Sequence, residues 1–366
     1  MRRRTMLQHT GVGLCGLVSF GCVPEDSVKD VAPAPQGTIF YPPLPNPPRI
    51  QYLRTFTGEQ DILRPVSDFT SFVLGDQPLT ASLKQPYGVE MYEGKLYVVD
   101  TGAARISIFD LVNQQFLSFT GTGNGRMKRP INVTIDNDGT KFVCDTGRKQ
   151  ILIYNNDNQY LKAFGARGQF KPVDVVIADQ RLYVVDIEHH QIHILDKNTG
   201  KTISIFGKAG SGAGELFHPT NIALDSGGDI YVVETSNFRV QRFSPSGESI
   251  RTYGKIGDSL GQFARPKGIA IDRMDRIYVG DAAFENIQVF DNEGQLLLFF
   301  GNQGEIGQRV NLPAGISLNY DDIGHFQHFA DPNFKLDYVI FVASQFGPNK
   351  IDVFGFGKLA GVEYPS

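Results

Sequence analysis

The sequence predicts an all-β protein, a six-bladed β-propeller of four-stranded antiparallel blades. Three observations support this fold class. A segment headed by proline recurs every 42 to 47 residues, each copy contains four short strands separated by Gly, Asn and Asp turns, and no long stretch has helical periodicity. Because one blade cannot bury both of its faces, the copies must stack around a common axis.

The four strands are recognisable in each repeat. The first begins at a proline, the second is apolar and ends in an acid, the third alternates, and the fourth ends in an aromatic residue followed by glycine. The repeats open at Pro86, Pro130, Pro172, Pro219, Pro266 and Pro313. The acids that end the second strands are Asp100, Asp145, Asp186, Glu234 and Asp281. Because these acids recur in five blades, we expect them to accept hydrogen bonds from loop amides; a ring of site carboxylates is the alternative.

The sixth repeat lacks a fourth strand, and an unassigned strand precedes the first repeat. Residues 48–56 have the right length to complete blade six, which would close the ring and remove an exposed edge. We therefore expect a propeller over residues 48–358, with a long connection over 57–84 and a C-terminal tail over 359–366.

The N-terminal segment predicts export. Residues 1–21 combine three arginines, a short apolar stretch and a final glycine, as in a signal peptide, and the arginines resemble a twin-arginine signal. Cys22 then stands at the position of the lipidated cysteine of a bacterial lipoprotein. Residues 22–47 are rich in proline and predict an extended linker. We expect the chain to be lipid-anchored through Cys22, facing the periplasm or the outside.

Two motifs carry a family resemblance. The NHL repeat is resembled by the segment Asp100–Ile106 and its relative at Asp145–Ile151, and also by Pro266–Asp272. The resemblance covers most of residues 48–356 and implies a six-bladed propeller, which agrees with the repeat count. Blade six departs from the pattern, because residues 319–336 are inserted and Ser344 replaces the strand-end acid. The family includes binding proteins and a few enzymes, so the fold alone does not assign a function.

Propeller enzymes suggest where chemistry would lie. The gluconolactonase-like family implies Glu, Asn and Asp around a metal in the channel, and the amidating lyases related to NHL proteins imply a zinc held by histidines of different blades. Asn132, Asp174 and Asn221 each stand two residues after a blade proline, so we expect them to line the channel. His325 and His328, in the blade-six insertion, are the candidates for a metal site. We otherwise expect no metal and no cofactor.

Sorting charges by connectivity predicts two unlike faces. We define the first face by the loops that enter strand one and join strands two and three, and the second face by the other loops of each blade. Basic residues collect on the first face and acids on the second, in a chain of net charge −4. The basic residues expected to bind a partner are Arg105, Arg129, Lys171, His218, Arg239, Arg265 and Lys267.

These observations predict a non-catalytic binding or scaffold lipoprotein of the cell envelope, whose first face engages an anionic protein or ligand. The alternative is a propeller enzyme, a lyase or lactonase, with a divalent metal in the channel. We expect no nucleic-acid partner, because an exported protein rarely meets one, and a monomer or a subunit of a larger complex.

Overall fold

The computed structural model describes residues 37–62, 81–302 and 309–364. All described residues belong to one compact unit. The expected signal peptide, Cys22 and the first part of the expected linker lie outside the described residues. Within the described ranges, no helix is long and apolar enough to cross a membrane.

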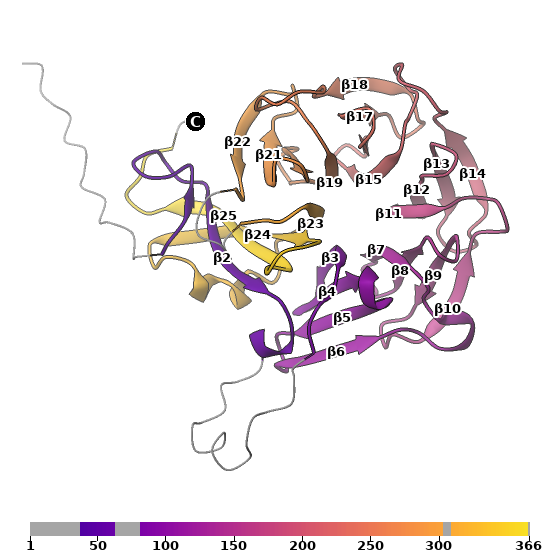
Figure 1. The fold of residues 1–366 in the computed structure, drawn as a ribbon, viewed down its shortest axis with the longest axis horizontal. Helices are drawn as coiled ribbons and strands as arrows, with labels where there is room; N and C mark the ends of the chain where they lie inside the picture. Colours follow the sequence, from indigo (N-terminus) through magenta and orange to yellow (C-terminus); the bar gives the residue numbers. More distant parts are fainter. Residues whose placement is uncertain (1–36, 63–80, 303–308, 365–366) are drawn as a thin grey trace, which may run out of the picture. The chain divides into compact units, whose positions relative to one another are not determined.

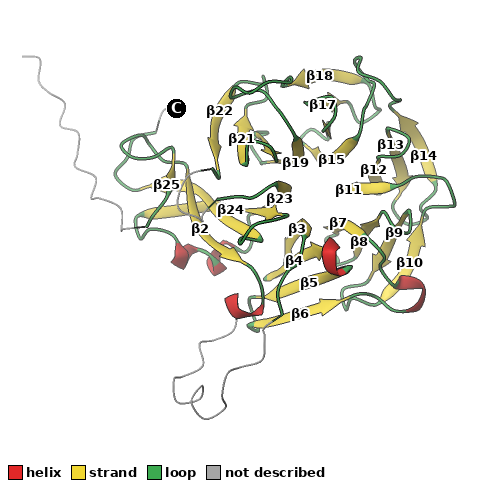
Figure 2. Ribbon diagram, in the orientation of Figure 1, coloured by secondary structure: helices red, strands yellow, loops and turns green. Residues whose placement is uncertain are grey.

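The described residues form six antiparallel sheets arranged in a ring, which confirms the predicted fold class (Figures 1 and 2). Blade one consists of β3 (Pro86–Tyr92), β4 (Lys95–Asp100), β5 (Arg105–Asp110) and β6 (Gln115–Phe119), and blade two consists of β7 (Pro130–Ile135), β8 (Lys141–Asp145), β9 (Gln150–Tyr154) and β10 (Tyr160–Phe164). Blade three consists of β11 (Pro172–Ala178), β12 (Arg181–Asp186), β13 (Gln191–Asp196) and β14 (Thr202–Phe206), and blade four consists of β15 (Pro219–Leu224), β16 (Ile230–Glu234), β17 (Arg239–Phe243) and β18 (Ser249–Tyr253). Blade five consists of β19 (Pro266–Ile271), β20 (Ile277–Asp281), β21 (Asn286–Phe290) and β22 (Leu296–Phe300). Figure 1 shows the first strand of every blade innermost.

Blade six is completed by the N-terminal strand, as predicted. Its sheet order is β1-β2-β25-β24-β23, where β23 is Pro313–Asn319, β24 is Phe334–Ser344 and β25 is Ile351–Leu359. Strand β2 (Ile50–Phe56) runs antiparallel to β25, with Ile50 opposite Phe356 and Phe56 opposite Ile351. The first and last strands of the folded unit are therefore hydrogen-bonded neighbours.

The folded unit extends beyond the expected boundaries at both ends. Strand β1 (Phe40–Tyr41), inside the expected linker, pairs with β2 as a fifth strand of blade six. The Tyr41 ring is buried against Phe300 and Phe354, with centroids 6.0 and 6.2 Å away. In the expected tail, the Tyr364 hydroxyl donates to the Pro48 carbonyl at 2.8 Å. Burial of the Tyr41 ring explains why this proline-rich stretch is fixed to the blades.

The core lies between successive blades. Apolar side chains of the second and third strands are almost fully buried and pack against the first and second strands of the next blade; Ile151 and Cys144 of blade two, for example, share a cluster with Val175 and Leu182 of blade three. Each buried Val, Leu or Ile contributes about 1.5–3 kcal/mol. Continuous packing around the ring positions the first strands, and with them the channel.

The strand-end acids hold loops, as the structural interpretation predicted. The Asp145 carboxylate accepts the backbone N–H groups of Lys128 and Arg129 at 2.7 and 3.0 Å. Asp100 and Asp281 make the equivalent bonds in blades one and five. In blade six, Ser344 occupies the acid position and its hydroxyl donates to the buried Asp352 carboxylate at 2.8 Å. Each acid therefore fixes the loop that enters its own blade.

Candidate functional site

The first strands of the six blades enclose a central cavity of about 650 Å³. Since side chains alternate along a strand, the third and fifth residues of these strands point toward the axis. The lining residues from these two positions are Asn132, Asp174, Asn221 and Gly315 (third) and Glu90, Thr134, Val176, Ala223, Ala270 and Ser317 (fifth). The three residues expected from the sequence to line the channel therefore all lie in the cavity wall.

Asp174 organises the deep part of the cavity. Its carboxylate is 4% exposed and accepts the side-chain amides of Asn132 (2.6 Å) and Asn221 (3.2 Å) from the two neighbouring blades. It also accepts the backbone N–H groups of Val175 (2.8 Å) and Ile222 (3.0 Å). Two bonds to each oxygen use the capacity of the carboxylate. Burial nevertheless raises the pKa of Asp174 to about 7.

Glu90 is the second carboxyl group of the inner wall, and sequence reasoning missed it. It is partly buried, and its one recorded hydrogen bond comes from the Ser317 hydroxyl at 3.4 Å. Burial, reinforced by the nearby Asp174 charge, raises the pKa of Glu90 to about 8. Close to neutral pH this carboxyl therefore exchanges a proton readily, as a general acid or base requires.

Tyr87 spans the first-face end of the channel. It precedes the axial position of β3 by one residue, and its hydroxyl approaches the Asn221 Oδ1 atom, on the opposite side of the ring, at 3.5 Å. Gly88 allows the close packing beside it, because a Cβ there would lie 2.1 Å from Asn132 Oδ1. The other end of the cavity is lined by Asp136, Asn137 and Asp179, from the loops between first and second strands. The cavity therefore opens on the second face.

The cavity wall is electronegative. Its described acids are Glu90, Asp136, Asp174 and Asp179, and its one described cation is Lys197, which pairs with Asp136 at 2.6 Å. Near neutral pH the raised pKa keeps Glu90 mostly protonated and Lys197 offsets Asp136, so Asp179 and the ionised fraction of Asp174 supply a modest negative charge, which disfavours anionic ligands. The arrangement suits a neutral or cationic small molecule.

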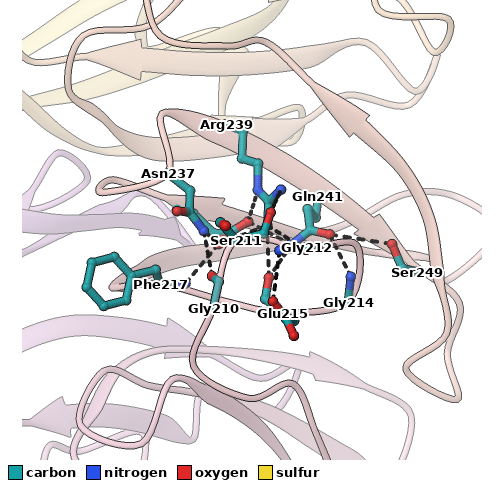
Figure 3. A network of polar contacts seen from close by, with 11 residues as sticks. Gly210, Ser211, Gly212, Gly214, Glu215, Phe217, Asn237, Arg239, Gln241 and Ser249 are labelled. Carbon is teal, nitrogen blue, oxygen red and sulfur yellow. Dashed lines mark hydrogen bonds and ion pairs between the residues drawn. The ribbon is translucent and has the colours of Figure 1, made fainter.

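Two of the basic residues expected to bind a partner are used inside the fold. The Arg239 guanidinium pairs with Glu234 at 2.6 Å and donates to the carbonyls of Ser211, Gly212 and Glu215 (Figure 3). It thereby fixes the glycine-rich connection between blades three and four. Arg105 similarly lies 3.3 Å from Asp100 and donates to the Ser82 carbonyl.

The other five basic residues lie near the axis on the first face. Arg129, His218 and Arg265 are exposed and Lys171 is partly buried, each immediately before the first strand of its blade. Lys267 is 8% exposed; its ammonium donates to Gln345 Oε1 and lies 5.7 Å from the Tyr87 ring centroid. Burial lowers the pKa of Lys267 to about 8, and Arg265 adds to that effect.

The residues of the cavity do not fit the metal that related enzymes imply. No histidine is among the described lining residues, and the described ranges contain no group of three or more His, Cys, Asp and Glu side chains suited to an ion. Both Asp174 oxygens are occupied by N–H donors. His325 and His328 lie in two short 3-10 helices of the blade-six insertion, η4 (Ile323–His325) and η5 (Gln327–Phe329), beside a separate cavity of about 280 Å³.

Comparisons with known proteins agree with the fold. A family model described as a 6-bladed beta-propeller matches residues 170–253. A probable peptidyl-alpha-hydroxyglycine alpha-amidating lyase of Caenorhabditis elegans is 29% identical over 119 residues, which cover 30% of this chain and 34% of that protein. The chain thus matches about a third of the length of this curated relative.

Two solved structures share the fold at low identity. Virginiamycin B lyase from Staphylococcus aureus superposes with a TM-score of 0.52 at 15% identity, covering 76% of this chain and 86% of that one. A gluconolactonase of Xanthomonas campestris superposes with a TM-score of 0.55 at 15% identity, covering 89% and 99%. At these identities the likeness shows a shared fold alone.

Proposed function

We propose that this chain is an enzyme of the lyase or lactonase kind that works in its central cavity. The observation that carries the proposal is Glu90, a carboxyl group with a pKa of about 8 in the wall of a cavity open at one end. The names of the similar proteins, two lyases and a gluconolactonase, support catalysis over the non-catalytic scaffold that the charge pattern favoured.

In this proposal Glu90 moves the proton. In its ionised form it takes a proton from the substrate or from an attacking water, and in its protonated form it gives a proton to the departing oxygen or nitrogen. Ser317 holds the carboxyl in place from the neighbouring blade. A pKa of about 8 makes both forms available close to neutral pH.

Asp174 acts as a positioning residue. It accepts one N–H from each of Asn132 and Asn221 and so fixes the orientation of both amides. An amide has two N–H donors, so each can still offer one to a substrate carbonyl oxygen. Donors held in place before the reaction stabilise charge that develops on such an oxygen.

The shape and charge of the cavity define the substrate class. A volume of about 650 Å³ is typical of small-molecule sites. The acidic lining favours a neutral or cationic compound, and the opening on the second face gives the route of entry. We propose a small ester, lactone or carbinolamide without net negative charge.

The test is a turnover screen of the full chain against such compounds, with two variants. Glu90→Gln keeps the size of the side chain but cannot ionise, and Glu93→Gln makes the same change three residues away at an exposed turn. We expect wild type and Glu93→Gln to turn over a member of the panel and Glu90→Gln to lose about 10²–10⁴-fold in kcat. A Glu90→Gln protein as active as wild type would refute the role of Glu90.

We also propose that the enzyme is exported and anchored by lipid on Cys22. The basic and apolar N-terminal pattern supports this location. An envelope location places the cavity where it meets substrates arriving from outside the cell.

A further inference from the structure

The first face carries a charge pattern that the cavity chemistry does not use. Arg129, Lys171, His218 and Arg265 each precede the innermost strand of one blade, in the four consecutive blades from two to five. They therefore form an arc of basic side chains around the first-face end of the axis. We call these four residues and Lys267 the basic arc.

Three strand-end carboxylates near the basic arc bond to the backbone of arc residues but not to their side chains; Asp186 also bonds to the His189 and His193 rings. Asp145 accepts the N–H of Arg129 at 3.0 Å, Asp186 that of Lys171 at 3.0 Å, and Asp281 that of Arg265 at 3.1 Å. The acids fix the loop backbones while the cationic ends remain outside. Among the described residues, no ion pair includes a member of the basic arc.

Two other first-face acids are already paired with lysines outside the arc. Glu188 lies 2.6 Å from Lys149, and Glu215 lies 3.3 Å from Lys208. The charges of Glu188 and Glu215 are therefore offset locally, whereas the exposed Glu285, in the loop between β20 and β21 on the same face, is in none of the described ion pairs. The basic arc still holds four arginine and lysine side chains.

Lys267 is the most buried side chain of the basic arc. Its side chain is 8% exposed, yet its recorded partners are the neutral Gln345 amide and the Tyr87 ring. A buried ammonium without a carboxylate is costly, and a bound anion removes that cost. Lys267 is the second residue of β19, at the first-face end of that strand, so an anion would approach it from the first face.

We propose that the basic arc is a docking site for an acidic peptide segment of a partner protein, with one carboxylate of that segment reaching Lys267. Arginine and lysine side chains spread over three consecutive or near-consecutive blades match several carboxylates along an extended chain better than a single small anion, and charge complementarity of this kind speeds association and gives specificity. The site is independent of the proposed chemistry in the cavity, which opens on the other face.

The test measures binding of a fluorescent deca-glutamate peptide to the full chain in detergent, with a neutral Gly-Ser peptide as the probe control. Arg129→Glu/Arg265→Glu reverses two charges of the arc, and Lys162→Glu/Lys201→Glu makes the same change in net charge away from it. We expect the arc variant to bind at least about tenfold more weakly and the matched control to bind within about twofold of wild type.

Lys267→Met tests the deep end of the site, because methionine fills the same space without charge. We expect weaker peptide binding at an unchanged or raised melting temperature, and we expect Glu90→Gln to bind like wild type. Equal loss in the arc variant and the matched control, or no loss in either, would overturn the proposal. Citrate that binds as tightly as the peptide at equal carboxylate concentration would also overturn it, by showing a small-anion site.

Discussion

Replacing Glu90 by glutamine should change how stability depends on pH. Burial raises the pKa of Glu90 from 4.5 to about 8 in the folded protein. Between these values the folded state holds one proton more than the unfolded state, so the free energy of unfolding falls as pH rises through this window. The penalty is complete above pH 8 and absent below pH 4.5.

The magnitude follows from the same two values. The two pKa values of Glu90 differ by about 3.5, and each tenfold change in the proton-binding constant is worth about 1.4 kcal/mol. The full difference therefore corresponds to about 5 kcal/mol. Water in the open cavity screens part of it, so we expect Glu90→Gln to gain about 2–4 kcal/mol over wild type between pH 5 and pH 9. The difference in free energy of unfolding between Glu90→Gln and wild type should therefore increase from pH 5 to pH 9.

The assay is reversible urea unfolding of wild type, Glu90→Gln and Glu93→Gln at pH 5 and pH 9. Glu93 is exposed at the turn that follows β3, so its variant should follow the wild-type curve at both pH values. If the differences in free energy of unfolding among the three proteins are the same at pH 5 and pH 9, Glu90 has an ordinary pKa and the reasoning about the cavity fails.

Three further predictions concern other parts of the chain. Arg239→Met should lower the free energy of unfolding by about 3–5 kcal/mol in urea, because it leaves the buried Glu234 carboxylate without its cation; a loss below about 1 kcal/mol would contradict this role of the ion pair. Lys267→Met without ligand should raise the melting temperature by about 2–4 °C, which calorimetry would detect, since a buried unpaired ammonium is removed. Cys22→Ser should move the protein from the membrane to the soluble fraction of its host, and retention of the variant in the membrane would refute lipid anchoring.

Much of the fold follows from the sequence because the repeat is physical. A proline, an apolar strand ending in an acid, and an aromatic–glycine end recur because every blade solves the same packing problem. Closure by residues 50–56 was also predictable, since a ring tolerates no unpaired edge. Strand β1 was not predictable, because a two-residue strand carries no period and is fixed by contacts distant in sequence: Phe40 packs against Phe334, and Tyr41 packs against Phe300 and Phe354.

The cavity was predictable in part. Counting two residues from each blade proline finds Asn132, Asp174 and Asn221, and counting four finds Glu90, the one charged residue at that position in six blades. The alternation of side chains along a strand was the available signal for Glu90. No local pattern shows that Tyr87 crosses the axis toward Asn221, because that contact joins opposite sides of the ring.

The first face shows the limit of sorting charges by loop. Arg239 begins a third strand and Arg265 precedes a first strand, so connectivity assigns both to the first face. Arg239 is nevertheless bonded to Glu234 and three carbonyls, while Arg265 is exposed. The difference depends on the course of the glycine-rich connection, which only the folded structure reveals.

The most direct test of the central claim is the pH dependence of kcat for the substrate found in the turnover screen. The account predicts that kcat of wild type changes with an apparent pKa of about 8 and that Glu90→Gln loses both the activity and that transition. A profile that is unchanged in Glu90→Gln, or a full chain that turns over nothing in the panel while the fold is intact, would contradict the claim that this propeller is an enzyme acting through Glu90.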